Sequence, residues 1–206
     1  MAENNESEMS PLPFLNMEFL NSPGARTIRI LSEYLEPAER LRRARIHDTI
    51  VFFGSARSLS PEQAAQQLTQ VNEEIERAGA ASAELAAART RAETAVRLAR
   101  FYQDALELSR RLTEWSKSLT GGRAFIICSG GSGGMMEAAN RGASLAGGKT
   151  MGLNIQLPRE QSVNSYVTRE LIFNFRYFFM RKFWFVYLAK ALVIFPGGLG
   201  TMDEFF

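Results

Sequence analysis

The sequence has almost none of the residues that build cross-links and metal sites. Cys128 is its one cysteine and His47 its one histidine. A single cysteine cannot form an intramolecular disulfide, and the two residues provide too few ligands for a structural zinc site. We therefore expect a protein of the reducing cytoplasm. We predict that Cys128 is a small buried apolar residue, since no histidine lies near it in sequence, and that His47 is structural or exposed.

A long hydrophobic run and a strong net charge are also missing. The most apolar stretch, Phe183 to Pro196, spans about 14 residues and contains Lys190, whereas a membrane-spanning helix needs roughly 20 apolar residues. The N-terminus has no basic segment followed by an apolar run, so it does not resemble a secretory signal. Lysine and arginine number 24 against 22 acidic residues, a net charge of +2. We predict a soluble protein that binds neither nucleic acid nor membranes, with any anion site being local.

The chain is expected to form one globular domain with a tail and an arm. Residues 1–25 are polar and contain prolines, which predicts little fixed structure. Apolar residues at helical spacing predict a helix over about 27–45, which Pro37 should bend or restart. We place the N-terminal helical segment at 26–47 and the main domain at 48–206.

From residue 48 onward, short apolar segments alternate with helical ones. Strands are expected at 48–53, 124–128, 149–155, 166–172 and 191–195, the last strongly buried, and helices at about 133–146 and 175–188. Strands that alternate with helices predict an α/β fold, a Rossmann-like parallel sheet with helices on both faces.

A long helix-forming segment, about 60–118, interrupts this pattern. Ser60-Pro61-Glu62-Gln63 has the signature of a helix start, and Gly79 predicts a break. The segment is far longer than one crossover helix. It forms either a pair of helices packed on the sheet or an arm that contacts another subunit.

Two glycine-rich loops follow predicted strands. The first is Ser129-Gly-Gly-Ser-Gly-Gly134, and the second is Phe195-Pro-Gly-Gly-Leu-Gly-Thr-Met-Asp-Glu204. Glycine lets the backbone approach a ligand, and free amides at a helix start attract an anion, although tight turns also need glycine for packing. Since ligands bind at the carboxyl ends of the strands in open α/β sheets, both loops should face one crevice. Neither loop is a Walker A sequence or a complete Gly-x-Gly-x-x-Gly fingerprint, which disfavours a kinase or a dehydrogenase.

These segments resemble the Lonely Guy (LOG) nucleotide phosphoribohydrolases. Pro196-Gly-Gly-Leu-Gly-Thr-Met-Asp-Glu204 resembles the PGGxGTxxE motif, and Arg181-Lys182 resembles the Arg-Lys pair of that family. Ser129 to Met136 is similar to its first glycine-rich loop, with serine where many members have glycine, and Gly54-Ser55 matches the loop after its first strand. The resemblance covers about 48–57 and 124–206. Short plant-type members lack the long helical segment, so the sequence is more similar to the longer bacterial members.

The resemblance implies a dimeric enzyme, and we expect a homodimer or a higher homo-oligomer that uses no cofactor or metal. Such enzymes hydrolyse the N-glycosidic bond of a nucleoside 5′-monophosphate to free base and ribose 5-phosphate. The base is an N6-substituted adenine in the cytokinin-activating branch, and other branches take AMP or related nucleotides. An older description, possible lysine decarboxylase, has no support here, since no pyridoxal-phosphate motif is evident. LOG-like proteins continue with further strands and helices, so the resemblance also implies a sequence that ends before the fold is complete.

Glu204 and Arg181 are the catalytic candidates. Glycoside hydrolysis passes through an oxocarbenium-like transition state that a carboxylate stabilises, a role for Glu204. Thr201-x-x-Glu204 is also a capping box, and the two roles can coexist. Arg181 lies among aromatic residues, where a buried cation needs an anionic partner. It either holds substrate and stabilises developing charge, as the resemblance implies, or pairs with a structural carboxylate.

The resemblance also implies a set of substrate-binding residues. The second loop would hold the 5′-phosphate, and the first would line the nucleotide. Glu137 could bind ribose hydroxyls, although a place near a helix N-terminus explains an acidic residue equally well. Lys182 points about 100° away from Arg181 on a helix and is less suited to the same role. The full set is Gly54, Ser55, Ser129, Gly130, Gly131, Gly133, Glu137, Lys182, Gly197, Gly198, Gly200 and Thr201.

Two rival functions stay open. A Rossmann-like carrier or sensor would hold a nucleotide or cofactor without cleaving it, and product formation separates it from the enzyme. A dinucleotide-dependent oxidoreductase is disfavoured because no acidic residue ends a second strand about 20 residues after a full glycine fingerprint. The presence of both Arg181 and Glu204 favours the enzyme.

Overall fold

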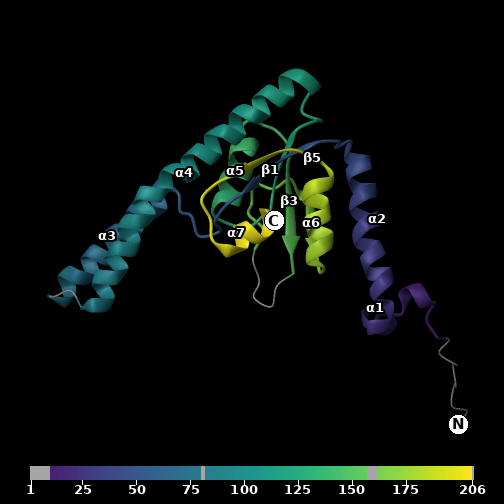
Figure 1. Cartoon of the computed structure of the whole chain (residues 1–206), viewed down its shortest axis with the longest axis horizontal. Coiled ribbons are helices and arrows are strands. Elements are labelled where there is room, and N and C mark those ends of the chain that lie inside the picture. The colour runs from purple at the N-terminus through teal and green to yellow at the C-terminus, as the bar shows by residue number, and fades with distance from the viewer. Residues whose placement is uncertain (1–9, 80–81, 157–161, 206) are drawn as a thin grey trace, which may run out of the picture.

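A computed structural model describes residues 10–79, 82–156 and 162–205. Its centre is a five-stranded sheet in the order β4-β3-β2-β1-β5 (Figure 1). All four strand pairs are parallel. The strands are β1 (Thr49–Phe53), β2 (Ile126–Ser129), β3 (Thr150–Ile155), β4 (Ile172–Phe175) and β5 (Ala189–Ile194). The predicted α/β, Rossmann-like class is confirmed.

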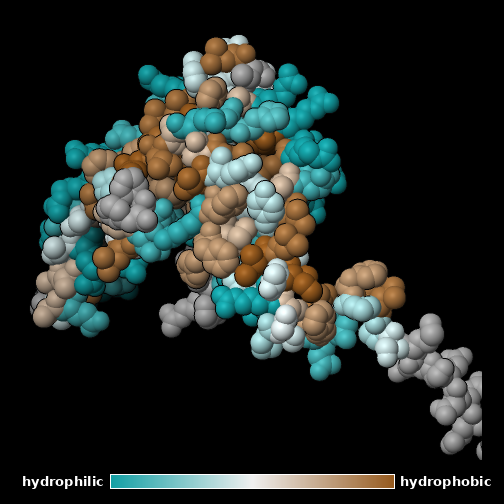
Figure 2. Space-filling view, turned by 45° about the vertical axis from the view of Figure 1, so that its right-hand side comes forward, coloured by the Kyte–Doolittle hydropathy of each residue, from teal (hydrophilic) through white to brown (hydrophobic). Residues whose placement is uncertain are grey.

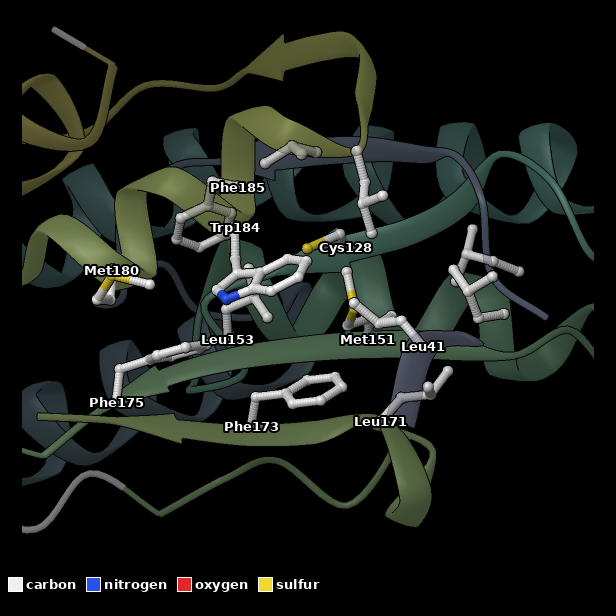
Figure 3. Close-up of a cluster of buried hydrophobic side chains, with 14 of the residues drawn as sticks. Leu41, Cys128, Met151, Leu153, Leu171, Phe173, Phe175, Met180, Trp184 and Phe185 are labelled. Atoms are coloured by element: carbon white, nitrogen blue, oxygen red, sulfur yellow. The ribbon is translucent and has the colours of Figure 1, made fainter. Parts of the chain in front are cut away.

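Helices cover both faces of the sheet. On one face α5 (Met135–Leu145) packs against β1 and β2, and α4 (Ala83–Thr120) packs outside α5. The other face carries α2 (Arg26–Ala44) and α6 (Phe178–Tyr187). Because successive strand side chains point to opposite faces, Ile50 and Phe52 of β1 join the α5 cluster, whereas Val51 and Phe53 join the α2 and α6 cluster. Figure 3 shows this second cluster, in which Cys128 is fully buried as predicted.

Helix α2 continues through Pro37, which we expected to bend or restart it. A proline inside a helix has no N–H to give to the carbonyl four residues earlier, here that of Glu33. The indole Nε1 of Trp184 in α6 donates to this carbonyl oxygen at 2.9 Å. A tertiary hydrogen bond thus replaces the missing helical one.

The 60–118 segment forms a helical hairpin. Helix α3 (Pro61–Ala78) begins with the predicted capping box of Ser60 and Gln63, and Gly79 ends it in the left-handed conformation at φ 68°. The C-terminal half of α4 packs on α5 so closely that a Cβ at Gly142 would lie 2.0 Å from the Leu106 carbonyl oxygen. The rest of the hairpin projects beyond the sheet (Figure 1). One end of the hairpin therefore packs on the body through α5, and the other end projects as an arm, whose contact with another subunit stays a prediction.

The prediction of little fixed structure for residues 1–25 is wrong for residues 13–25. They form three short helical elements, η1 (Pro13–Leu15), α1 (Met17–Asn21) and η2 (Pro23–Ala25). Arg29 of α2 fixes them, because its Nη1 donates to the carbonyl oxygens of Leu20 and Ser22 at 2.5 and 2.7 Å. Residues 1–9 lie outside the described residues.

Two strand predictions also need correction. The strand expected at 166–172 lies instead at Ile172–Phe175, after a 3-10 turn at Arg169–Leu171. The structure buries Leu171, Phe173 and Phe175, and helix α6 begins three residues after Phe175. The last strand, β5, is not strongly buried: it is the edge strand of the described sheet, and its Leu192 and Ile194 are 44% and 46% exposed.

Further apolar side chains lie on the surface, and several belong to α2 and α6 (Figure 2). Those of the two helices are Ile28, Leu31, Tyr34, Leu35, Phe178, Phe179, Phe183, Val186 and Tyr187. Within the described part of the chain, no helix is long and apolar enough to cross a membrane. His47 is exposed, in agreement with one of the two expectations for it. The homodimer stays a prediction.

Candidate functional site

The loops after β1 and β5 meet in one pocket of about 590 Å³. It also contains side chains of α6 and of the short helix α7 (Leu199–Phe205). Of the predicted site residues, it brings together Gly54, Ser55, Arg181, Lys182, Gly198, Gly200, Thr201 and Glu204. The pocket lies at the carboxyl ends of parallel strands, where open α/β sheets bind their ligands.

Arg181 and Glu204 are in direct contact in this pocket. The Nη1 group of Arg181 donates to Glu204 Oε1, and its Nε donates to the Leu153 carbonyl oxygen at 2.7 Å. The guanidinium also lies 5.0 Å from the ring centre of Phe185. The side chains of Arg181 and Glu204 are 9% and 20% exposed. The buried cation therefore has the anionic partner that its apolar surroundings require, and that partner is the other catalytic candidate.

The capping role considered for Glu204 is wrong. A capping box needs Thr201 at the residue before the helix, but α7 begins at Leu199. The amides of Thr201 and Met202 instead donate to the Gly198 carbonyl oxygen at 3.0 and 3.2 Å. Glu204 is thus turned towards Arg181 from within the helix.

Lys182 is paired with the same helix. Its Nζ lies 3.2 Å from Asp203 Oδ1. The neighbouring residues Arg181 and Lys182 of α6 therefore contact the neighbouring residues Glu204 and Asp203 of α7. These two pairs fix α6 and α7 relative to each other along one wall of the pocket.

The first glycine-rich loop supports the site more than it lines it. The Ser129 hydroxyl accepts from the Gly131 amide at 3.1 Å and donates to Asn140 Oδ1 at 2.7 Å. Asn164 Nδ2 donates to the Gly131 carbonyl oxygen at 3.0 Å. A Cβ at Gly130 would lie 2.6 Å from Arg181 Nη2, so glycine leaves the space that the guanidinium occupies.

The pocket lining includes only part of that loop. Ser132 lines it, together with Met136 of α5, whereas four of the predicted residues do not: Ser129, Gly130, Gly131 and Gly133. Gly134 has φ 66°, and a Cβ there would meet the Ser55 carbonyl oxygen at 2.3 Å. Gly134 thus serves the close packing of this loop on the loop after β1.

The glycines of the second loop differ in their surroundings. A Cβ at Gly197 would meet the Thr201 side chain at 2.1 Å, which accounts for glycine at that position. At Gly198 and Gly200 a Cβ would meet nothing within 4 Å, and neither has a positive φ. Protein packing therefore does not require glycine at these two pocket-lining positions, whereas the close approach of a ligand would.

Glu137 is not among the lining residues of this pocket. Its Oε1 accepts a hydrogen bond from the Tyr102 hydroxyl of α4 at 3.0 Å. Burial raises the pKa of Tyr102 to about 12. Sequence reasoning missed this contact, because Tyr102 lies in the helical segment outside every motif.

The pocket also contains residues that sequence reasoning missed. They are Ala56, Arg57, Ser132, Met136, Ile155, Phe178, Leu199 and Asp203. Arg57 is the one cation among them, and it lies two residues after Ser55, in the loop where Gly54-Ser55 resembles the LOG sequence. Its position in a loop that follows a predicted first strand was the signal that could have found it. Among the described residues, no cluster of histidine, cysteine, aspartate or glutamate has the composition of a metal site.

A larger cavity, about 890 Å³, lies between α2 and the ends of β3 and β4. Its main polar side chains already have partners in the protein. Arg29 binds the N-terminal turns, Glu33 accepts from the amides of Arg176 and Tyr177, and Asn154 donates to Asn174. We therefore assign the functional site to the smaller pocket, where charged side chains and open glycines converge.

The fold and the paired loops define a Rossmann-like α/β protein with a ligand pocket at the carboxyl edge of its sheet. Residues 136–206 match the family model described as possible lysine decarboxylase, the older description of LOG-type proteins. The match covers about a third of the chain and includes Arg181, Lys182 and the whole second loop.

A solved structure is also similar to the chain. It is described as the X-ray structure of TM1055, a structural genomics target, and it is 28% identical with a TM-score of 0.41. The similarity covers 52% of this chain and 56% of that chain. The matched region thus spans little more than half the length of that protein. No curated protein matches the sequence.

Proposed function

We propose that the protein hydrolyses the N-glycosidic bond of a nucleoside 5′-monophosphate and releases free base and ribose 5-phosphate. The observation that carries this proposal is the contact between Arg181 and Glu204 inside a pocket formed by two strand-end loops. The match of residues 136–206 to a LOG-type family model supports it.

Glu204 supplies the carboxylate that the reaction needs. Cleavage of the glycosidic bond builds positive charge on the ribose ring, and a nearby carboxylate stabilises that charge while it orients or deprotonates water. The Glu204 side chain retains 20% exposure at the pocket, so its carboxylate is accessible to water and substrate.

Arg181 positions this carboxylate and contributes donors of its own. A guanidinium has five N–H groups, and the contacts with Leu153 and Glu204 use only part of them. No hydrogen bond of Nη2 is found among the described residues. Arg181 can therefore bind a substrate hydroxyl or the departing base while it continues to hold Glu204.

The open glycines of the second loop give the phosphate a place. Gly198 and Gly200 line the pocket without being required by packing, and Thr201 provides a hydroxyl beside them. Backbone amides and hydroxyl groups are common ligands of phosphate in α/β proteins. A phosphate here would hold the ribose close to Glu204.

The test is incubation with a panel of nucleoside 5′-monophosphates, followed by chromatography of free base and ribose 5-phosphate. Glu204→Gln and Arg181→Met should each lower the rate, by about 100-fold or more for Glu204→Gln. Glu74→Gln, at an exposed position of α3, is the matched control and should retain full activity. Nucleotide binding with no release of base from any substrate would contradict the enzyme and favour a carrier or sensor.

A further inference from the structure

The charges that line the pocket are unequally matched. Three cations, Arg57, Arg181 and Lys182, face two anions, Asp203 and Glu204. Arg181 pairs with Glu204 and Lys182 pairs with Asp203. Among the described residues, Arg57 has no ion-pair partner. The pocket therefore has one positive charge that the protein does not neutralise.

The backbone that carries Arg57 is held in place. The Arg57 amide donates to the Ser55 hydroxyl at 3.1 Å, and the first amide of α5, that of Met135, donates to the Ser55 carbonyl oxygen at 3.0 Å. This loop also packs on Gly134, where a Cβ would lie 2.6 Å from the Ala56 carbonyl carbon. Arg57 thus extends from a fixed turn, with an exposed side chain at the wall of the pocket.

We propose that Arg57 is a specificity-determining residue that binds the phosphate group of the substrate and makes the pocket select nucleotides over nucleosides. This inference rests on the proposed function, which it deepens by naming a residue outside the glycine loops. A guanidinium is planar and always charged, and its fork of N–H groups matches two phosphate oxygens. The uncompensated charge favours an anionic ligand over a neutral one of the same shape.

The chemistry of the contact predicts which kinetic constant changes. The phosphate does not react when the glycosidic bond breaks, so Arg57 binds it equally in the ground state and the transition state. Loss of such uniform binding raises KM and leaves kcat nearly unchanged. Because Arg57 is exposed, the loss should be at the lower end for charge-assisted hydrogen bonds, about 10-fold in affinity.

The experiment uses the full chain and measures ribose 5-phosphate affinity by calorimetry together with nucleotide hydrolysis. Arg57→Gln should weaken ribose 5-phosphate binding by about 10-fold and raise the nucleotide KM by a similar factor, with kcat within about two-fold. Arg57→Lys, which retains the charge but loses the fork, should show a smaller loss. Arg91→Gln removes the same charge from an exposed position on α4 and should change neither constant.

The outcomes separate this inference from the proposed function. Normal hydrolysis with unchanged KM and ribose 5-phosphate affinity in Arg57→Gln would overturn the role of Arg57 and leave the enzyme intact. Ribose 5-phosphate binding that depends on Arg57, without cleavage of any nucleotide by the unmodified chain, would support the role and overturn the enzyme. A loss of affinity in Arg91→Gln equal to that in Arg57→Gln would also overturn it, because net charge alone would then explain the effect.

Discussion

The ion pair of Arg181 and Glu204 should contribute measurably to folding stability as well as to the reaction. Three variants test this: Arg181→Met, Glu204→Gln and the double variant. Methionine retains an apolar side chain against Phe185, and glutamine retains an oxygen that accepts from Arg181. Each substitution therefore removes charge with little change of shape.

The expected magnitude follows from burial. Removal of one member of a fully buried ion pair costs about 3–5 kcal/mol, because the other charge stays desolvated. Glu204 is 20% exposed and can be partly hydrated, so we expect about 2 kcal/mol for Arg181→Met. Glu204→Gln should cost about 1–2 kcal/mol, because the guanidinium retains the Leu153 carbonyl. The double variant should be more stable than the sum predicts, with a coupling of about 1 kcal/mol.

Urea unfolding measured by circular dichroism provides the free energies. The m value should stay constant across the four proteins, since the surface exposed on unfolding hardly changes. A loss of about 2 kcal/mol corresponds to a fall in Tm of roughly 4–8 °C for a chain of this size. Additivity of the two single effects within about 0.3 kcal/mol would refute the direct contact, because uncoupled sites behave in that way.

Three further predictions concern packing, the loops and pH. Trp184→Phe should lower the unfolding free energy by about 1–3 kcal/mol, because the Glu33 carbonyl loses its donor. The loss should be smaller in a Pro37→Ala background, where a helical N–H again donates to that carbonyl, and equal losses in urea titrations would contradict this account. Gly54→Ala should lower the unfolding free energy by about 1–3 kcal/mol, since the new Cβ would lie 2.7 Å from the Met135 side chain of α5. Gly200→Ala should leave stability nearly unchanged and weaken nucleotide binding in calorimetry. Burial raises the pKa of Tyr102 from 10.0 to about 12, so the folded state binds the phenolic proton more tightly than the unfolded state. The stabilisation from this proton is fully present below pH 10, and the unfolding free energy should fall by up to about 2 kcal/mol as pH rises to 12. Tyr102→Phe should lack this loss in pH-dependent unfolding.

The fold was largely predictable where local signals agree. Short apolar runs located β1, β2 and β3, the first two followed by glycine and serine, and the Ser60 cap located the start of α3. The segment around Leu171 was harder, since only the single polar residues Asn174 and Arg176 interrupt the apolar residues between the expected strand and helix α6. Only packing against the sheet decides that Phe173 and Phe175 lie in the strand. The exposure of β5 depends on its place in the strand order, which its own residues do not encode.

The sequence predicted part of the lining of the candidate pocket but not the contacts within it. Arg181 and Glu204 were identified separately, 23 positions apart, and only the fold brings them together. Glu137 lies in the first turn of a helix, as expected, but its hydrogen-bond partner is Tyr102, which comes from a segment without a motif. Arg57 was missed because it is polar, exposed and outside the motif residues. Its significance appears only when the other charges of the pocket are seen to be paired.

The central claim is that the pocket breaks the bond between base and ribose and leaves the phosphate ester intact. The most direct measurement is a complete product balance for one cleaved nucleoside 5′-monophosphate, with free base, ribose 5-phosphate, nucleoside and inorganic phosphate quantified together. The account predicts equal amounts of free base and ribose 5-phosphate, and no release when Glu204 is replaced by glutamine. Nucleoside and inorganic phosphate in equal amounts would contradict it, because the bond broken would then be the phosphate ester.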